Sequence, residues 1–268
     1  MRGGALCYGM VIFLAALIQI TLLVLPARAE PVRLPGPDGV ILEAALFRPA
    51  GPVRGAVVAL HGCGGAFAAR DAQWTAVLLE AGQVVLFPDS FGSRGLGSQC
   101  RVKQSERLAT SYGLRRRDAI AAGEWLARQE GRPVALLGWS DGGSTVLAVA
   151  RAGRGLPVGV FRRFIAFYPG CRGAAAAAGW VAEAPVDILM GAADDWTPIA
   201  PCRALAGQAA QVRLHEFAGA YHDFDAPGPI RLLRDIPTSQ NADRTVRVGM
   251  DPAGRDAAMV LVPRLLAE

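Results

Sequence analysis

The feature that most constrains the fold of this chain is the alternation of short apolar runs with longer, helix-compatible stretches. Each run is continuous and rich in Val, Ile and Leu, which is typical of a strand buried on both faces of a parallel sheet. The runs occupy residues 56–60, 84–88, 134–137, 164–167, 186–190 and 212–217. The helix-compatible stretches occupy residues 68–81, 116–129, 142–151 and 255–266. The alternation predicts an α/β domain with a mostly parallel central sheet and helices on both faces.

The remaining sequence predicts one further strand and a single domain. Residues 40–47 precede the alternating pattern, and we expect them to form an antiparallel edge strand. Hydrophobic residues make up 52% of the chain, which is enough to fill a sizeable core. Because no internal repeat or long linker interrupts the pattern, residues 30–268 are predicted to form a single domain.

The first 29 residues have the pattern of a targeting segment. Arg2 supplies a positive start, residues 5–25 form an apolar run, and residues 27–29 have the small-x-small pattern of a cleavage site. A retained membrane anchor is the alternative, because the run is long enough to span a bilayer. The polar, Pro-rich stretch after it favours cleavage. We therefore expect residues 1–29 to be a signal peptide and the protein to be periplasmic or secreted, without a stable membrane anchor.

The cysteines agree with an exported protein. After the targeting segment the chain retains Cys63, Cys100, Cys171 and Cys202. An even number in an exported chain indicates two disulfides, with three possible pairings, and free buried thiols are the alternative. No CxxC spacing occurs, so we expect neither a metal nor a redox site. The basic residues are dispersed apart from two short clusters, and nucleic acid is not an expected partner.

The sequence Gly-Trp-Ser-Asp-Gly at residues 138–142 is the candidate nucleophile motif. It joins the predicted strand 134–137 to the predicted helix 142–151. A sharp strand-to-helix turn tolerates only small residues two positions before and after its serine, and it exposes the hydroxyl at a helix N-terminus. There the positive end of the helix dipole stabilises developing anionic charge. Ser140 is therefore predicted to be a nucleophile.

A serine nucleophile needs a positioned base, and the chain has three histidines. In a sheet of this type the order along the chain is nucleophile, acid, then base. His222 fits this order, because it lies in a loop after the last predicted strand. His215 lies within that strand and is the reserve candidate. His61 precedes Ser140, and we expect its ring to hold its own loop in place.

The acid is expected at the end of the strand between Ser140 and His222. Asp194 and Asp195 both follow the predicted strand 186–190. Adjacent side chains diverge, so only one carboxylate can orient the imidazole. We predict Asp194 for this role and expect Asp195 to cap a helix that starts near residue 198.

Two backbone amides are expected to form an oxyanion hole. One is the N–H of Asp141, directly after the nucleophile, and the other comes from the loop after the first buried strand. That loop has the sequence Gly-Cys-Gly-Gly at residues 62–65, which allows a tight turn. Cys63 is the predicted second donor.

Several segments together resemble a known family. HGCGG at 61–65, PDSFGSRG at 88–95, GWSDGG at 138–143, GAADDWTP at 191–198 and YHDFD at 221–225 are similar to motifs of the dienelactone hydrolase family. The resemblance covers roughly residues 35–268. It implies an α/β-hydrolase fold without a large lid, an ester or lactone substrate, and no cofactor.

The resemblance also assigns the family's nucleophile, acid and base to Ser140, Asp194 and His222. The founding dienelactone hydrolases use cysteine as the nucleophile, so Ser140 is a departure that favours a more general carboxylesterase. The Ala-rich segment before the strand 186–190 is short, which argues against a lipase-type lid and long-chain triglycerides.

The implied fold refines the remaining expectations. Each of two cysteine pairs follows neighbouring strands, which predicts the disulfides Cys63–Cys100 and Cys171–Cys202. Arg94 is a candidate for binding a substrate carboxylate. Aromatic residues near the strand ends are candidates for lining the pocket, and they are Trp139, Tyr168, Trp196 and Tyr221.

The predicted function is that of a serine hydrolase that cleaves carboxylic esters or lactones through an acyl-enzyme intermediate. A serine peptidase or acyltransferase on the same fold is the nearest alternative. A catalytically inactive binding protein that retains the scaffold is the alternative from another class. The sequence does not indicate the oligomeric state.

Overall fold

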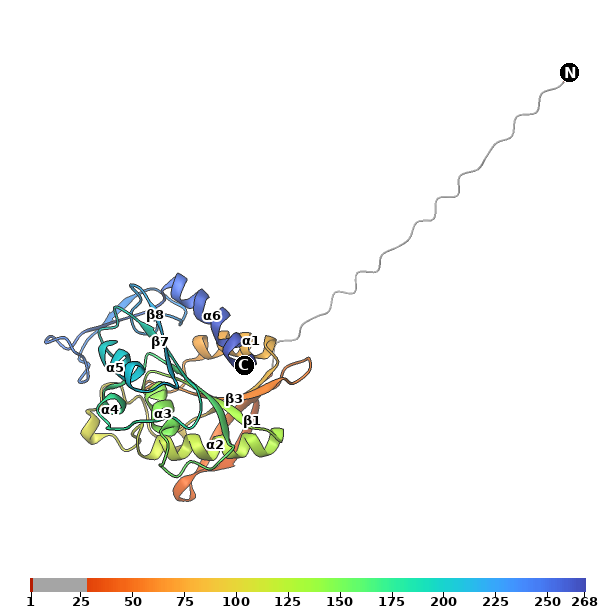
Figure 1. Cartoon of the computed structure of the whole chain (residues 1–268), viewed down its shortest axis with the longest axis horizontal. Helices are drawn as coiled ribbons and strands as arrows, with labels where there is room; N and C mark the ends of the chain where they lie inside the picture. The colour runs from red at the N-terminus through yellow and green to blue at the C-terminus, as the bar shows by residue number, and fades with distance from the viewer. Residues whose placement is uncertain (2–27) are drawn as a thin grey trace.

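The computed structural model describes Met1 and residues 28–268. Its centre is an eight-stranded sheet with the order β1-β2-β4-β3-β5-β6-β7-β8 (Figure 1). The first two strands are antiparallel to their neighbours, and the other six run parallel to one another. This is the α/β-hydrolase fold that the sequence predicts.

The bounds of the elements follow the apolar runs of the sequence closely. The strands of the sheet are β1 (Glu30–Pro35), β2 (Ile41–Phe47), β3 (Gly55–Leu60), β4 (Gln83–Pro88), β5 (Val134–Trp139), β6 (Phe161–Phe167), β7 (Val186–Gly191) and β8 (Val212–Phe217). The helices are α1 (Ala68–Glu80), α2 (Leu114–Glu130), α3 (Asp141–Ala150), α4 (Arg172–Ala175), α5 (Ala200–Gln208) and α6 (Pro252–Ala267). A separate two-stranded ribbon pairs β9 (Arg231–Leu233) with β10 (Val246–Val248).

The apolar runs of the sequence form the central strands of the sheet, which is covered by helices on both faces. Every residue of β3, β5 and β7 is buried. In Figure 1, α1 and α6 lie on one side of the sheet and α2 and α3 on the other. A strand between two helical layers has no solvent-facing side, so its sequence is apolar without alternation.

The N-terminal edge of the sheet differs from the prediction. Residues 40–47 do form an antiparallel strand, β2, but β2 is not at the edge. The edge strand is β1, whose register pairs Glu30 with Leu46 and Pro35 with Ile41. No apolar run marks β1, because most of its side chains are exposed and two of its six residues are proline.

The predicted signal peptide lies almost entirely outside the described residues. No helix in the part of the chain that the structure describes combines the length and the apolar character needed to cross a membrane.

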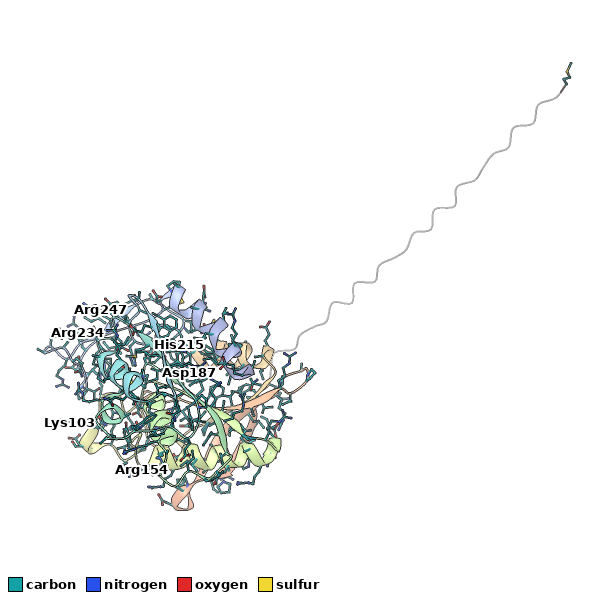
Figure 2. The ribbon with its side chains drawn as sticks, viewed as in Figure 1. Lys103, Arg154, Asp187, His215, Arg234 and Arg247 are labelled. Atoms are coloured by element: carbon teal, nitrogen blue, oxygen red, sulfur yellow. A yellow bond between two sulfur atoms is a disulfide. The ribbon has the colours of Figure 1, made fainter. Side chains whose placement is uncertain are left out.

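A buried ionic cluster joins the strands β6, β7 and β8 to the C-terminal residue. The Asp187 carboxylate of β7 accepts hydrogen bonds from Arg163 Nη1 at 2.7 Å, Arg213 Nε at 2.8 Å and His215 Nε2 at 2.9 Å. Both arginines also bind the Glu268 carboxylate. Figure 2 shows Asp187 and His215 close together. His215, the reserve candidate for the base, therefore belongs to this cluster.

Glycines set the close packing of α3 against the sheet. A Cβ on Gly142 would overlap the carbonyl oxygen of Leu60, and one on Gly143 would lie 2.7 Å from that of Phe167. A Cβ on Gly138 would lie 2.5 Å from the carbonyl oxygen of Gly142. No side chain fits at these positions, and this lets α3 begin directly against β3 and β6.

This packing predicts opposite outcomes for two helical glycines. Gly142→Ala is expected to lower the free energy of unfolding by roughly 1–3 kcal/mol or more, since its methyl group meets backbone atoms. Gly207→Ala in α5 is the matched control, because a Cβ there meets nothing within 4 Å. It is expected to stabilise the protein by up to about 1 kcal/mol. Urea denaturation measures both, and equal stabilities of the two variants would contradict the packing argument.

Candidate active site

Ser140 stands at the turn between β5 and α3 in a backbone conformation that side-chain-bearing residues rarely adopt. Its φ is 55° and its ψ is −113°. Strained backbone of this kind persists where the surrounding structure holds it, and it concentrates at functional sites. Here the Ser140 N–H donates to the carbonyl of Phe167 at 2.9 Å, which ties the turn to the end of β6.

The structure brings Ser140, His222 and Asp194 together in one chain of hydrogen bonds. Ser140 Oγ lies 2.9 Å from His222 Nε2, and His222 Nδ1 lies 2.7 Å from Asp194 Oδ2. The Asp194 carboxylate is acceptor-only when ionised, so Nδ1 carries the proton and Nε2 is free to accept from the hydroxyl. All three residues are buried or nearly so.

The Asp194 side chain is fixed by its own loop. Asp194 Oδ1 accepts from the backbone N–H groups of Trp196 and Thr197, both at 2.8 Å. The Thr197 hydroxyl lies 2.9 Å from Asp194 Oδ2. These donors hold the carboxylate in the orientation that faces His222.

The electrostatic environment of His222 favours its charged form. Burial is the largest effect and lowers the pKa of the imidazole, but the carboxylates of Asp194, Asp223 and Asp225 together outweigh it, with Asp194 first among them. The pKa of His222 is therefore raised above its ordinary value of 6.5. A base must be neutral to accept a proton, so turnover through His222 is expected to rise with pH through a pKa above 6.5.

Asp195 points away from the imidazole. Its Oδ1 accepts from the backbone N–H of Arg247 at 2.8 Å, and its Oδ2 accepts from the Arg247 guanidinium at 3.0 Å. Asp195 thus ties the loop after β7 to the β9–β10 ribbon. The expectation that Asp195 caps a helix was wrong, because α5 begins after Ile199 without a side-chain cap.

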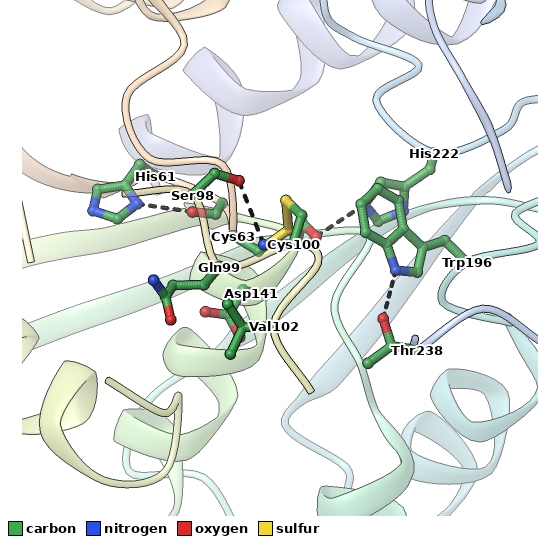
Figure 3. Close-up of a disulfide and its surroundings, with 12 residues drawn as sticks. His61, Cys63, Ser98, Gln99, Cys100, Val102, Asp141, Trp196, His222 and Thr238 are labelled. Carbon is green, nitrogen blue, oxygen red and sulfur yellow. Dashed lines mark hydrogen bonds between the residues drawn. A yellow bond between two sulfur atoms is a disulfide. The ribbon is translucent and has the colours of Figure 1, made fainter. Parts of the chain in front are cut away.

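Cys63 and Asp141, the predicted oxyanion donors, line the same cavity as Ser140. In the part of the chain that the structure describes, neither backbone N–H donates to a protein acceptor. Cys63 is bonded to Cys100, as the implied fold predicts (Figure 3). The carbonyl of Cys63 accepts from the Gln99 N–H at 2.7 Å, which fixes the loop further.

His61 is buried directly before the loop that carries Cys63. Its Nδ1 lies 2.8 Å from the Gly62 carbonyl, and its ring packs edge-on against Phe91 at 4.6 Å between centroids. Burial and the nearby Arg115 guanidinium lower the pKa of His61 to about 4. His61 is thus neutral at physiological pH and anchors its loop, as expected from its place in the sequence.

Arg94 does not have the position that was predicted for it. Its guanidinium makes a bidentate pair with the buried Asp118, at 2.9 and 2.8 Å, and also donates to the Ser90 carbonyl at 2.9 Å. It does not line the cavity. The prediction failed because the partner on α2 lies 24 residues away in sequence.

The predictions for Trp139 and Tyr221 were also wrong. Trp139 is fully buried and donates from Nε1 to Asp225 Oδ2 at 2.9 Å, so it belongs to the core. The Tyr221 ring packs against the Arg247 guanidinium, 5.5 Å from it. Of the four predicted aromatic residues, Trp196 alone lines the cavity. Its ring also packs on His222, with 4.8 Å between centroids.

Asp225 has a role that the sequence did not reveal. This fully buried carboxylate accepts hydrogen bonds from Trp74 Nε1 at 2.7 Å, Trp139 Nε1 at 2.9 Å and the Tyr168 hydroxyl at 2.7 Å. Burial raises the pKa of Asp225. One carboxylate thus joins the residue before the nucleophile to the loop that carries His222. The acidic residues of the YHDFD motif were the available signal.

The cavity in front of Ser140 has a volume of about 780 Å³. Its walls come from residues 104–112, 170–176, 196–201 and 237–240. The second expected disulfide, Cys171–Cys202, lies at one wall. Arg107, Arg172 and Asp141 are the charged residues that line the cavity, and Arg107 Nη1 lies 3.8 Å from Asp141 Oδ1. The wall at 237–240 belongs to the β9–β10 connection, which the sequence pattern did not reveal.

Comparison with known proteins gives the family. The sequence model of the dienelactone hydrolase family matches residues 42–248. The chain belongs to the dienelactone hydrolase family. No curated protein matches the chain in sequence. Among the residues that the structure describes, no group of His, Cys, Asp or Glu side chains is arranged to hold a metal ion.

Solved structures share the fold at low identity. A dienelactone hydrolase from Anabaena variabilis is 19% identical, with a TM-score of 0.63 over 89% of this chain and 96% of that one. A dienelactone hydrolase-like promiscuous phosphotriesterase from metagenomic libraries is 18% identical, with a TM-score of 0.65 over 89% and 98%. Esterase 2 from Thermogutta terrifontis, phosphoramylated by tabun, is 19% identical, with a TM-score of 0.60 over 89% and 93%.

The two adjacent aspartates make a direct test of the geometry. Asp194→Asn is expected to lower kcat by roughly 10³–10⁴-fold, because an amide does not stabilise the proton on Nδ1 or the charged imidazole. Asp195→Asn is the matched control, and kcat is expected to change by less than about tenfold, since this carboxylate binds Arg247 instead. Steady-state kinetics on an activated ester measures both. A larger loss in Asp195→Asn would contradict the assignment.

The lowered pKa of His61 predicts how stability depends on pH. The pKa of His61 is near 6.5 in the unfolded chain and about 4 in the folded protein. Between these pH values His61 therefore binds more protons in the unfolded state. The contribution of His61 to stability is complete above about pH 6.5 and is lost as the pH falls toward 4. Near pH 5 the slope from this group is about 1.4 kcal/mol per pH unit.

His61→Asn keeps an N–H donor for the Gly62 carbonyl but does not titrate. We expect its free energy of unfolding, measured by urea denaturation at several pH values, to fall less steeply below about pH 6.5 than that of the unmodified protein. Parallel curves would show that His61 is not held neutral by burial.

Proposed function

We propose that this protein is a serine hydrolase that cleaves carboxylic esters or lactones, without a cofactor. The observation that carries the proposal is the hydrogen-bond chain from Ser140 through His222 to Asp194, which begins at the wall of a cavity. A hydroxyl is a weak nucleophile until a positioned base accepts its proton, and this chain supplies that base.

The proposed mechanism proceeds through an acyl-enzyme. His222 Nε2 accepts the Ser140 proton while Oγ attacks the carbonyl carbon, and the oxyanion is stabilised by the N–H groups of Cys63 and Asp141. His222 then gives the proton to the leaving alkoxide as the C–O bond breaks. Water, deprotonated by His222, attacks the acyl-enzyme and releases the acid and free Ser140. Asp194 keeps the imidazole tautomer and stabilises its charged form.

The cavity supports a compact, polar substrate. The segment between β6 and β7 contains only the short helix α4, and the proposed enzyme therefore has no large lid. Arg107 and Arg172 line the cavity, and guanidinium groups bind carboxylates and other anions well. In this proposal Arg172 takes the substrate-binding role that the sequence suggested for Arg94, because Arg107 already pairs with Asp141.

The names of the structural neighbours agree with this chemistry. One neighbour is a phosphotriesterase, and the esterase from Thermogutta terrifontis is phosphoramylated by tabun. Attack on a carboxylic ester and attack on an organophosphate both use an activated nucleophile, which Ser140 supplies in this proposal.

The proposed location is outside the cytoplasm. Two disulfides indicate an oxidising compartment. With the targeting pattern of residues 1–29, they support a periplasmic or secreted enzyme whose mature domain begins near residue 30 and has no membrane anchor.

Activity-based labelling tests the proposal. A fluorophosphonate probe is expected to label the protein, and short-chain aryl esters to be hydrolysed. Ser140→Ala should abolish labelling and lower kcat by at least about 10⁴-fold. The control is Ser105→Ala, at an exposed serine in the turn Gln104–Glu106, which should leave both unchanged.

The alternatives give different results in the same experiment. Labelling of Ser140 with peptide amides cleaved faster than esters would favour a peptidase. A protein that neither reacts with the probe nor turns over any ester would be the inactive scaffold, and the proposal would be wrong.

A further inference from the structure

We propose that Arg115 is a positioning residue. It fixes the separation of the two amides of the proposed oxyanion hole and neutralises the Asp141 carboxylate beside them. The inference rests on the proposed function. Arg115 is the second residue of α2, and it is 1% exposed. It does not line the cavity, so it acts on the substrate only through the residues that it binds.

The Arg115 guanidinium bridges the two loops that carry the donors. Its Nη2 donates to the His61 carbonyl at 2.5 Å, two residues before Cys63. Its Nη1 donates to Oδ2 of Asp141. A guanidinium is planar and rigid, and a fork of this kind fixes the separation of the groups that it binds. The Phe91 ring packs against it, 4.9 Å from its central carbon.

The sheet alone does not hold these loops together. β3 and β5 are hydrogen-bonded neighbours, but their paired register ends at Leu60 and Gly138, before either loop begins. The disulfide links Cys63 to Cys100, in the segment after β4 (Figure 3). Arg115 supplies the connection from the buried side.

The charge of Arg115 matters as much as its shape. Asp141 carries a carboxylate on the residue whose N–H faces the developing oxyanion in the proposed mechanism. Burial is the largest effect and raises the pKa of this carboxyl, but Arg115, Ser111 and Arg107 together outweigh it, with Arg115 first among them, so the pKa is lowered. Asp141 is therefore ionised at neutral pH. An unneutralised anion there would repel the oxyanion.

The proposal predicts a loss in the transition state rather than in substrate binding. The oxyanion forms only as the tetrahedral intermediate forms, so the two amides contribute mainly to kcat. The ground-state ester makes its contacts with the cavity walls, and the Arg115 side chain does not itself line the cavity but reaches it through its bond to Asp141. We therefore expect kcat to fall while KM stays nearly constant.

The test compares Arg115→Gln and Arg115→Lys with Arg116→Gln. Arg116 lies on the same helix and also binds backbone carbonyls, those of Ala148 at 3.0 Å and Arg154 at 2.8 Å, but neither belongs to an oxyanion loop. Active sites are counted by fluorophosphonate titration, so every rate refers to folded enzyme. The substrate is a short-chain aryl ester.

Arg115→Gln is expected to lower kcat on the order of 10²-fold, which is the scale of losing one oxyanion donor. Arg115→Lys keeps the charge but not the fork, and a loss of about tenfold is expected. An aryl trifluoromethyl ketone, which forms a tetrahedral oxyanion adduct with Ser140, should bind more weakly by the same factor as kcat falls. Arg116→Gln should match the unmodified protein in both.

A double variant separates charge from geometry. In Arg115→Gln the Asp141 carboxylate loses its strongest partner, and Asp141→Asn removes that charge. The combined variant is expected to recover roughly tenfold in kcat over Arg115→Gln alone. The absence of any recovery would overturn the electrostatic part of the proposal.

The positioning role is overturned if both Arg115 variants keep wild-type kcat and ketone affinity per active site while losing only thermal stability. A rise in KM at constant kcat overturns it as well. If Arg115→Gln does not fold, the kcat and the ketone affinity of Arg115→Lys decide whether the positioning role holds. Failure of the unmodified protein to react with the probe or the ester refutes the proposed function instead, and the two failures are therefore distinguishable.

Discussion

The turn from β5 into α3 is the constraint on which the rest of the site depends. Ser140 has a φ of 55°, and the structure holds this strained residue by packing backbone directly against backbone. Glycine at 138, 142 and 143 removes every Cβ that would keep α3 away from the strand ends. Because α3 begins against β3 and β6, the loops after those strands lie beside the serine.

Three buried or nearly buried carboxylates lie close to the candidate site residues, and each accepts hydrogen bonds. Asp225 accepts from two indoles and a phenol, Asp141 pairs with Arg115, and Asp118 with Arg94. Removing the arginine of either ion pair leaves an uncompensated buried carboxylate, which costs about 3–5 kcal/mol. These networks therefore specify one arrangement of the loops, whereas apolar packing alone tolerates several.

Local pattern and sheet topology were enough to predict the central sheet and the candidate reacting groups. Ser140, Asp194 and His222 were found because the carboxyl ends of parallel strands meet at one edge of the sheet, whatever the loop conformations. Arg94 and Trp139 were misplaced because the direction of a side chain depends on partners far away in sequence, Asp118 and Asp225. The β9–β10 connection was missed because its strands have three residues each and carry no periodic signal.

The rim of the cavity is held by another kind of bond. Its walls are loops, the short helix α4 and the start of α5. The disulfides Cys63–Cys100 and Cys171–Cys202 each join a loop at a strand end to a more distant segment, and they close stretches of 37 and 31 residues. Cross-links over such lengths contribute roughly 3–4 kcal/mol each. Glycine packing and paired charges thus position the candidate site residues from inside, and covalent links hold the walls of the cavity.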